Sequence, residues 1–248
     1  RELSVWQQIM NHPRILPLFG IDYTSVQGLP FLVSPWMHRG TLLHYLSLSD
    51  RMKAPIESLL FEIADAVAFI HSRGFVHNDL TASNVLLDHE EHVRLAGFSL
   101  ADLPGQAHGE SMRSPRRLAP ELLHPEKYPV EGPTPSFATD VYAFASLCLE
   151  VYTLRMPFAD FRLDAQALYE VVQGRYPRRP TPEECGGRAI PDAIWALMEA
   201  CWAAAAARPS MSDVVQLLAT STQQVPVVPA PTLAAPTLPE PTPPTPTG

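Results

Sequence analysis

The chain has 248 residues, of which 46% are hydrophobic and 18% charged, and its formal net charge is -8. This length and apolar content suffice for one large hydrophobic core, whereas the negative charge argues against a nucleic-acid-binding surface, which needs clustered Lys and Arg. No run approaches the ~20 apolar residues of a membrane-spanning helix, so we expect no membrane partner. Three widely spaced cysteines, Cys148, Cys185 and Cys201, predict buried thiols in a cytoplasmic or otherwise intracellular protein.

The first half of the chain alternates helical and strand patterns. Leu3, Trp6, Ile9 and Met10 share one face of a predicted helix that ends at residues 11–13. Apolar runs at residues 15–23 and 29–36 predict a two-stranded hairpin. A long helix is predicted to begin at Pro55 and to end before Gly74, and its apolar positions are spaced to lie on one face. Those positions are Ile56, Leu59, Leu60, Ile63, Val67 and Ile70.

The second half is predicted to be mostly helical. Short strands are expected at residues 84–87 and 92–96, and a polar stretch rich in Pro and Gly covers residues 101–135. Four helices are expected, at residues 137–153, 165–174, 191–202 and 210–219. Residues 221–248 form a Pro- and Thr-rich tail, which we expect to be disordered. Its PxxP spacings have no Arg or Lys nearby, so a solvated linker is favoured over an SH3 ligand.

The segment from His77 to Asn84 reads His-Asn-Asp-Leu-Thr-Ala-Ser-Asn and lies between the long helix and a strand. It resembles the catalytic loop of protein kinases. In that family the loop presents a carboxylate to the incoming hydroxyl and, five residues later, an amide oxygen to a metal ion. The resemblance implies that Asp79 is a catalytic base, active or vestigial, and that Asn84 is a magnesium ligand.

Further segments resemble the same family in the same order. Residues 1–15 are similar to the helix of the smaller lobe, and residues 32–42 to the hinge and the start of the next helix. Ala119-Pro120-Glu121 resembles the end of the activation segment, and residues 140–145 and 201–211 resemble two later signatures. The resemblance covers residues 1–219 and is nearest to the tyrosine-kinase-like group.

The resemblance implies an α+β, two-lobed fold with an incomplete N-lobe sheet and a mainly helical C-lobe. The kinase-like domain is expected at residues 1–220, with the partial N-lobe and hinge at 1–37 and the C-lobe at 38–220. The resemblance implies that Glu121 and Arg208 form a buried ion pair. Removing either partner would leave a buried charge uncompensated. Asp140 is implied to accept backbone N–H groups of the 77–84 loop, and His77 is implied to stack on Phe98.

The family's adenine site is expected at the hinge. Pro35 provides a backbone carbonyl, Met37 provides an N–H, and the small Ser34 leaves the pocket open. Leu86 is implied as a fourth nucleotide-binding residue. The sequence contains neither the Gly-rich phosphate loop nor the Lys that would pair with Glu2, and we expect further sequence upstream of Arg1.

Four positions depart from the family pattern. Gly97 stands where the family has the Asp that binds magnesium, and glycine offers no side-chain ligand. Ser99 ends the same triplet. Thr81 replaces a Lys that contacts the γ-phosphate, which removes one positive charge from the transition state. Asn78 replaces the Arg that docks a phosphorylated activation loop, so control by such phosphorylation is not expected.

These departures predict a pseudokinase in signalling, a regulatory or protein-interaction module whose partners are other proteins. ATP and magnesium are expected to bind weakly or not at all. The alternative is an active ATP-dependent Ser/Thr protein kinase, in which Asn84 alone holds the metal and Gly97→Asp raises activity sharply. Retention of both Asp79 and Asn84 favours this alternative. A third hypothesis is a degenerate fragment, because the hairpin at residues 15–36 exposes a sheet edge.

Overall fold

A computed structural model describes residues 2–24, 31–48, 53–101, 103–104, 114–128 and 134–222. The hairpin turn, parts of the 101–135 stretch and residues 223–248 of the expected tail lie outside the described residues. The described helices are α1 (Glu2–Ile9), α2 (Leu42–Leu48), α3 (Ile56–Ser72), α4 (Pro120–Leu123), α5 (Phe137–Thr153), α6 (Asp164–Val172), α7 (Asp192–Trp202) and α8 (Met211–Thr222). The described strands are β1 (Gly20–Asp22), β2 (Phe31–Val33), β3 (Gly40–Thr41), β4 (Val85–Leu87) and β5 (Val93–Leu95).

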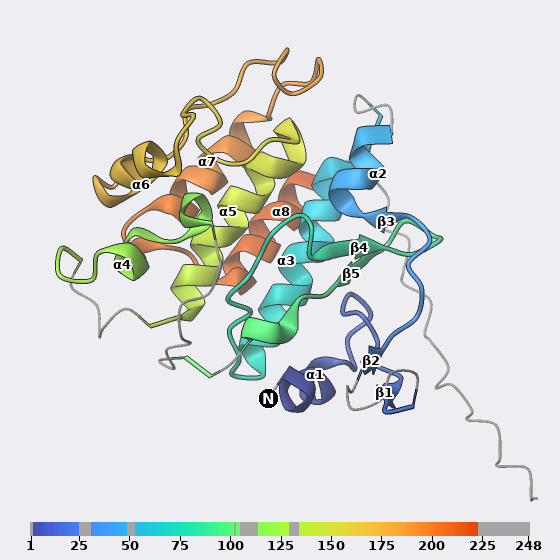
Figure 1. The fold of residues 1–248 in the computed structure, drawn as a ribbon. Helices are drawn as coiled ribbons and strands as arrows, with labels where there is room; N and C mark the ends of the chain where they lie inside the picture. Colours follow the sequence, from blue (N-terminus) through green and yellow to red (C-terminus); the bar gives the residue numbers. More distant parts are fainter. Residues whose placement is uncertain are drawn as a thin grey trace, which may run out of the picture.

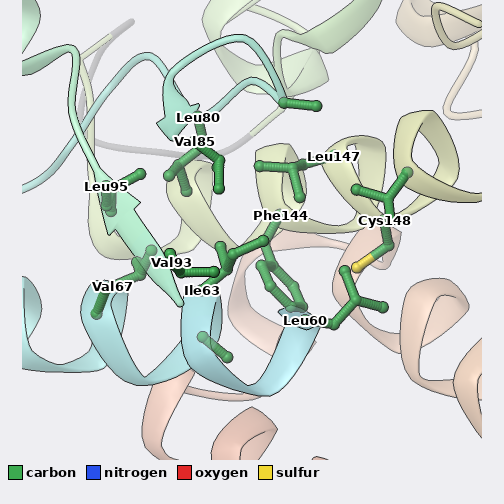
Figure 2. Packing of buried hydrophobic residues seen from close by; sticks show 14 of the residues in the cluster. Leu60, Ile63, Val67, Leu80, Val85, Val93, Leu95, Phe144, Leu147 and Cys148 are labelled. Carbon is green, nitrogen blue, oxygen red and sulfur yellow. The ribbon is translucent and has the colours of Figure 1, made fainter. Parts of the chain in front are cut away.

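The core of the helical body lies around α3 and α5. Helix α3 packs against α8, and α5 lies in the middle of the body, where it packs against α7 (Figure 1). All six apolar positions predicted for the face of α3 are buried, which confirms the helical pattern. Figure 2 shows side chains of α3, α5 and the strand pair β4–β5 meeting in this core, among them Ile63, Phe144 and Val85. Burial of this continuous apolar cluster supplies the main driving force for the fold.

Two small antiparallel sheets lie beside the helical body. Strands β1 and β2 pair as the predicted hairpin, although both are shorter than the apolar runs. Strands β3, β4 and β5 form the second sheet in that order. Ile15 makes a parallel bridge to Leu95 of β5, and the Trp6 indole N–H donates to the Leu16 carbonyl at 2.6 Å. These contacts fix α1 next to the end of β5.

Three local features differ from the sequence-based expectations. Met10 was predicted on the buried face of the first helix but is 37% exposed, because α1 ends at Ile9; Val5 is buried in that face instead. Strand β3 has two residues and carries no periodic signal, so the pattern did not predict it. The polar stretch contains a short helix, α4, and a 3₁₀ turn, η2 (Pro115–Arg117).

The remaining features agree with an α+β architecture of small sheets and a mainly helical body. All three cysteines are buried, as predicted, and burial raises the pKa of the Cys148 thiol well above its ordinary value. In the described part of the chain, no helix is long and apolar enough to cross a membrane.

Candidate functional site

The 77–84 loop connects α3 to β4 and is held in place by Asp140 of α5. The Asp140 carboxylate accepts the backbone N–H groups of His77 at 2.7 Å and Asn78 at 2.8 Å. His71 Nε2 lies 2.9 Å from the same carboxylate. Burial alone would raise the pKa of Asp140, but the hydrogen bond and positive field of His71 and the bond from His77 keep it below its ordinary value. A buried carboxylate therefore fixes the start of the loop.

A column of rings connects this loop to α1. The His77 ring lies 5.3 Å from the Phe98 ring, and Phe98 lies 5.6 Å from Trp6. His77 Nε2 faces the Ala96 carbonyl at 2.9 Å. Because a carbonyl only accepts, Nε2 carries the proton, and burial lowers the pKa of this imidazole. The structure thus brings together His77 and Phe98, the two residues implied to stack.

Asp79 and Asn84 lie next to each other in the loop. The Asn84 side-chain nitrogen donates to the Asp79 backbone carbonyl at 2.8 Å and to Asp79 Oδ2 at 2.9 Å. An amide nitrogen has two N–H groups, so both are used in bonds to Asp79. The amide end of Asn84 is therefore turned towards the carboxylate.

Gly97 completes this group, which we call the loop cluster (Asp79, Asn84 and Gly97). Gly97 has φ +83°, in the left-handed region that glycine adopts without strain. A Cβ at position 97 would lie 2.5 Å from Asn84 Nδ2 and 2.8 Å from Asn84 Oδ1, and closer still to Cγ. The Asn84 side chain therefore occupies the space in which any side chain at position 97 would begin.

The loop cluster does not fit a magnesium ion, which takes near-octahedral oxygen ligands and is commonly held by carboxylates. Gly97 supplies no carboxylate, so the loop cluster has a single carboxylate, that of Asp79, which accepts a bond from the Asn84 amide nitrogen. Across the part of the chain that the structure describes, no group of three or more His, Cys, Asp or Glu side chains is placed to hold a metal. The loop cluster therefore offers a metal fewer oxygen ligands than the family pattern does.

The other departures from the family pattern also have local partners. Thr81 Oγ1 lies 2.9 Å from Ser83 Oγ and contributes no positive charge. Asn78 has φ +66°, and its side chain donates to the Leu100 carbonyl at 3.2 Å. Asn78 thus links the 77–84 loop to the segment that follows Gly97. Ser99 is exposed in the 3₁₀ turn η1 (Phe98–Leu100).

The hinge residues lie between the two small sheets. Ser34, Pro35 and Met37 are half-buried, whereas Trp36 is 81% exposed. Met37 and Leu86 both pack against the hydrophobic core, and the Gly40 N–H donates to the Met37 carbonyl at 3.0 Å. The hinge therefore keeps an ordered backbone. Glu2 is half-buried in the first turn of α1.

Away from the loop cluster, Glu121 and Arg208 form a buried ion pair. Arg208 Nη2 donates to Glu121 Oε2 at 2.9 Å, and Nη1 donates to the Ala138 carbonyl at the same distance. The Arg208 side chain is 1% exposed and the Glu121 side chain is 5% exposed. This pair ties α4 to the segment before α8.

A second buried acid of α5, Glu150, was not predicted from the sequence, and it connects the 77–84 loop to Arg117. Its carboxylate pairs with Arg117 and also accepts the Ala82 backbone N–H at 3.3 Å. Burial raises the pKa of Glu150, while the Arg117 guanidinium opposes that rise. Asp140 and Glu150 are the acidic residues of an otherwise largely apolar α5, and that contrast is the signal that would have identified Glu150.

Comparisons with known proteins point to one family. A model of the family described as protein tyrosine and serine/threonine kinase matches residues 1–218. The tyrosine-protein kinase transforming protein Abl of Abelson murine leukemia virus is 30% identical over 234 residues, which cover 90% of this chain and 29% of that protein. Tyrosine-protein kinase ABL2 of Homo sapiens is 29% identical over 229 residues, which cover 89% of this chain and 18% of that protein.

A plant relative shows a similar match. Mitogen-activated protein kinase kinase kinase 5 of Arabidopsis thaliana is 27% identical over 172 residues, which cover 68% of this chain and 24% of that protein. The chain therefore spans less than a third of the length of each of these relatives.

Proposed function

The chain belongs to the protein tyrosine and serine/threonine kinase family, and from this premise we propose that it is a pseudokinase. In this proposal it is a kinase-shaped regulatory module that binds other proteins, binds ATP weakly or not at all, and transfers no phosphate. The observation that carries the proposal is the loop cluster. Gly97 offers no ligand, and the Asn84 amide is bonded to the carboxylate that would orient a substrate hydroxyl.

Negative charge must be stabilised on the phosphoryl group during its transfer. The protein contributes to this reaction mainly by positioning the groups and by stabilising negative charge. This chain has Gly97 in place of an acidic ligand and Thr81 in place of a cationic side chain. Loss of the acidic ligand is expected to cost several kcal/mol of transition-state stabilisation, or on the order of a thousandfold in rate.

The scaffold around the loop is retained, which is compatible with a role in binding. Asp140 fixes the 77–84 loop, and the Glu121–Arg208 pair fixes α4. Glu150 connects the loop to Arg117, which directly precedes the segment leading into α4. A kinase-shaped surface can therefore persist without turnover, and other proteins are the partners that such a surface would bind.

One observation favours the alternative of an active Ser/Thr kinase. Asp79 and Asn84 are retained five residues apart and lie in contact. In that case Asp79 would accept the proton of the substrate hydroxyl, and the remaining machinery would have to compensate for Gly97. The two hypotheses differ in one measurable quantity, the Asp79-dependent transfer of phosphate.

The test is a phosphoryl-transfer assay on the whole protein that contains this chain. ATP labelled at the γ-phosphate is supplied with Mg²⁺ or Mn²⁺, and incorporation into a generic protein substrate and into the chain itself is measured. We expect wild type and Asp79→Ala to give the same background signal. Incorporation by wild type that Asp79→Ala abolishes would establish the active alternative.

A further inference from the structure

A hollow of about 260 Å³ lies beside the end of α5, lined by the last turn of that helix, the 155–161 loop and residues 170–184. Small-molecule sites usually measure about 300–1,000 Å³, so this hollow fits one or two side chains of a peptide better than a cofactor. We call it the α5–α6 hollow. Its apolar lining includes Leu149, Met156, Phe158, Phe161 and Pro177.

The charged groups around the α5–α6 hollow are paired with one another. Arg178 bridges two acids: its Nε donates to Asp160 Oδ2 at 2.9 Å, and its Nη2 donates to Glu184 Oε1 at 2.7 Å. Arg175 Nη1 donates to Glu170 Oε2 at 2.8 Å. Among the described lining residues, three arginines are balanced by three acids. The hollow therefore has no net charge with which to attract a strongly charged ligand.

Two further features of the hollow fit a proline-rich peptide. Tyr176 is 43% exposed, and its ring is stacked on that of Trp202 with the centroids 5.6 Å apart, so it presents a rigid aromatic face. Aromatic faces of this kind bind polyproline II segments. The exposed Arg155 makes only long contacts, 3.5 Å to the Ala159 carbonyl and 3.8 Å to Glu184. Its N–H groups can donate to the backbone carbonyls of a polyproline II segment, which forms no internal hydrogen bonds.

The chain has a segment of matching chemistry after α8. Residues 223–248 are rich in Pro and Thr and contain one charged side chain, Glu240. Within them the sequence Ala-Pro-Thr-Leu occurs twice, at residues 230–233 and 235–238. Leu233 and Leu238 are the only leucines of this segment, and the prolines beside them restrict the backbone, which reduces the entropy lost on binding.

Helix α8 directs this segment towards the hollow. Met211, the first residue of α8, lines a pocket together with Ser72, the last residue of α3. Because α8 packs along α3 (Figure 1), it runs back towards the start of α3 and ends there. At that start, Glu57 accepts the Tyr152 hydroxyl at 2.7 Å and pairs with Arg188. Tyr152 directly precedes a residue that lines the hollow, so α8 ends on the same side of the body as the hollow.

We propose that residues 230–238 of this chain bind in the α5–α6 hollow of the same molecule, with Leu233 or Leu238 as the apolar anchor and the prolines against Tyr176. The segment is long enough, because 26 residues at ~3.1 Å each span about 80 Å in polyproline II. A domain of this size has a radius of gyration of only about 17 Å. Since the ligand is tethered, its effective concentration is on the order of millimolar, and a weak contact suffices.

The first test is photo-crosslinking of the whole protein that contains this chain. A photoreactive diazirine amino acid is placed at position 233 or 238, and the cross-linked peptides are identified by mass spectrometry. We expect cross-links to residues 153–161 and 175–180, with a yield that does not change on dilution. A yield that falls on dilution would mean that the segment binds a second copy. Cross-links to other parts of the body only, or none, would mean that the hollow has another occupant; any of these results would overturn the proposal.

Two exposed positions supply matched variants for this test. Met156 is 42% exposed and lines the hollow, whereas Leu163 is 63% exposed and does not line it. Met156→Glu is expected to lower the cross-link yield about fivefold, because it places a charge in the apolar lining, and Leu163→Glu is expected to leave the yield unchanged. The melting temperatures (Tm) of the two variants should agree within about 2 °C, since neither side chain is buried. Equal cross-link yields in both variants would contradict the proposal.

The second test changes the segment and leaves the folded body intact. Leu233→Ser combined with Leu238→Ser removes both anchors, and Val225→Ser combined with Val227→Ser is the control. In hydrogen–deuterium exchange, we expect the backbone amides of residues 154–161 to exchange several-fold faster in the leucine variant than in wild type, and the control to equal wild type. Equal rates in all three proteins would show that the leucines do not cover the hollow. Neither test uses phosphate transfer, so the proposed function can fail while this proposal stands, and the reverse.

Discussion

His77 shows how burial selects one protonation state in this protein. Its Nε2 donates to the Ala96 carbonyl at 2.9 Å, and its Nδ1 faces the Asp79 backbone N–H at 3.3 Å. A second proton would have to sit on Nδ1, directly opposite that N–H donor. Burial also penalises the charged ring and lowers its pKa below the ordinary 6.5. The folded state therefore requires neutral His77.

This requirement predicts a pH dependence of stability. Below pH 6.5 the unfolded chain binds a proton that folded His77 refuses, so stability is present at higher pH and is lost as pH falls from 6.5 towards the lowered pKa. The contribution is at most about 1.4 kcal/mol per pH unit. We expect Tm measured from pH 7.5 down to 5.5 to fall less steeply in His77→Phe than in wild type.

The control for this measurement is His89, whose side chain is 74% exposed. His89→Gln should keep the wild-type dependence of Tm on pH. An unchanged slope in His77→Phe would show that another group controls acid stability, whatever the overall stability of that variant.

At the same scale, the sequence identified the members of the loop cluster but not their arrangement. The resemblance to the kinase family brought Asp79, Asn84 and Gly97 together in one expected site, and the lack of a ligand at position 97 follows directly from the residue type. The position of Asn84 in the vacated space depends on its side-chain rotamer, which long-range packing decides. Glu150 escaped notice because its partners, Arg117 and Ala82, are distant in sequence.

Among the elements, α5 carries the largest share of the site's support, since it bears both Asp140 and Glu150. Its start is fixed by a capping box: the Ser136 side chain accepts the Thr139 N–H at 3.3 Å, and Thr139 Oγ1 accepts the Ser136 N–H at 3.0 Å. We expect Ser136→Ala to lower the free energy of unfolding by about 1 kcal/mol in urea denaturation. Ser136→Asp, which keeps a capping oxygen, should restore most of it; equal loss in both variants would argue against the cap.

Helices and strands were predictable where their pattern of apolar residues extended over many residues. Helices α3 and α5 have 17 residues each, and their apolar spacing located them nearly to the residue. The described strands have only two or three residues. The turns beside them indicated that strands were present but did not indicate where each strand begins and ends. Strand β3 forms only because β4 lies alongside it, which is information that the local sequence does not contain. Met10 was misplaced because the helix stops one residue before it.

On the scale of the whole molecule, the buried scaffold surrounds a loop cluster in which position 97 has no side chain. The buried Glu121–Arg208 ion pair and the apolar α3–α5 core hold the kinase-like body together. Figure 2 shows part of that core. The loop cluster lies where β4 begins and β5 ends, and Ile15, which follows α1, bridges to Leu95 at that end of β5. One residue type, glycine at position 97, therefore changes the function expected of a fold that is otherwise maintained.

The most direct test of this account is the Tm of the whole protein with ATP alone and with ATP plus Mg²⁺ or Mn²⁺. A ligand at about a hundred times its dissociation constant adds roughly 2.7 kcal/mol, which raises Tm by several degrees. The account predicts that any shift is small and is the same with and without metal. A rise in Tm that appears only when metal accompanies ATP would show that the site recruits a cation despite Gly97, and would contradict the central claim.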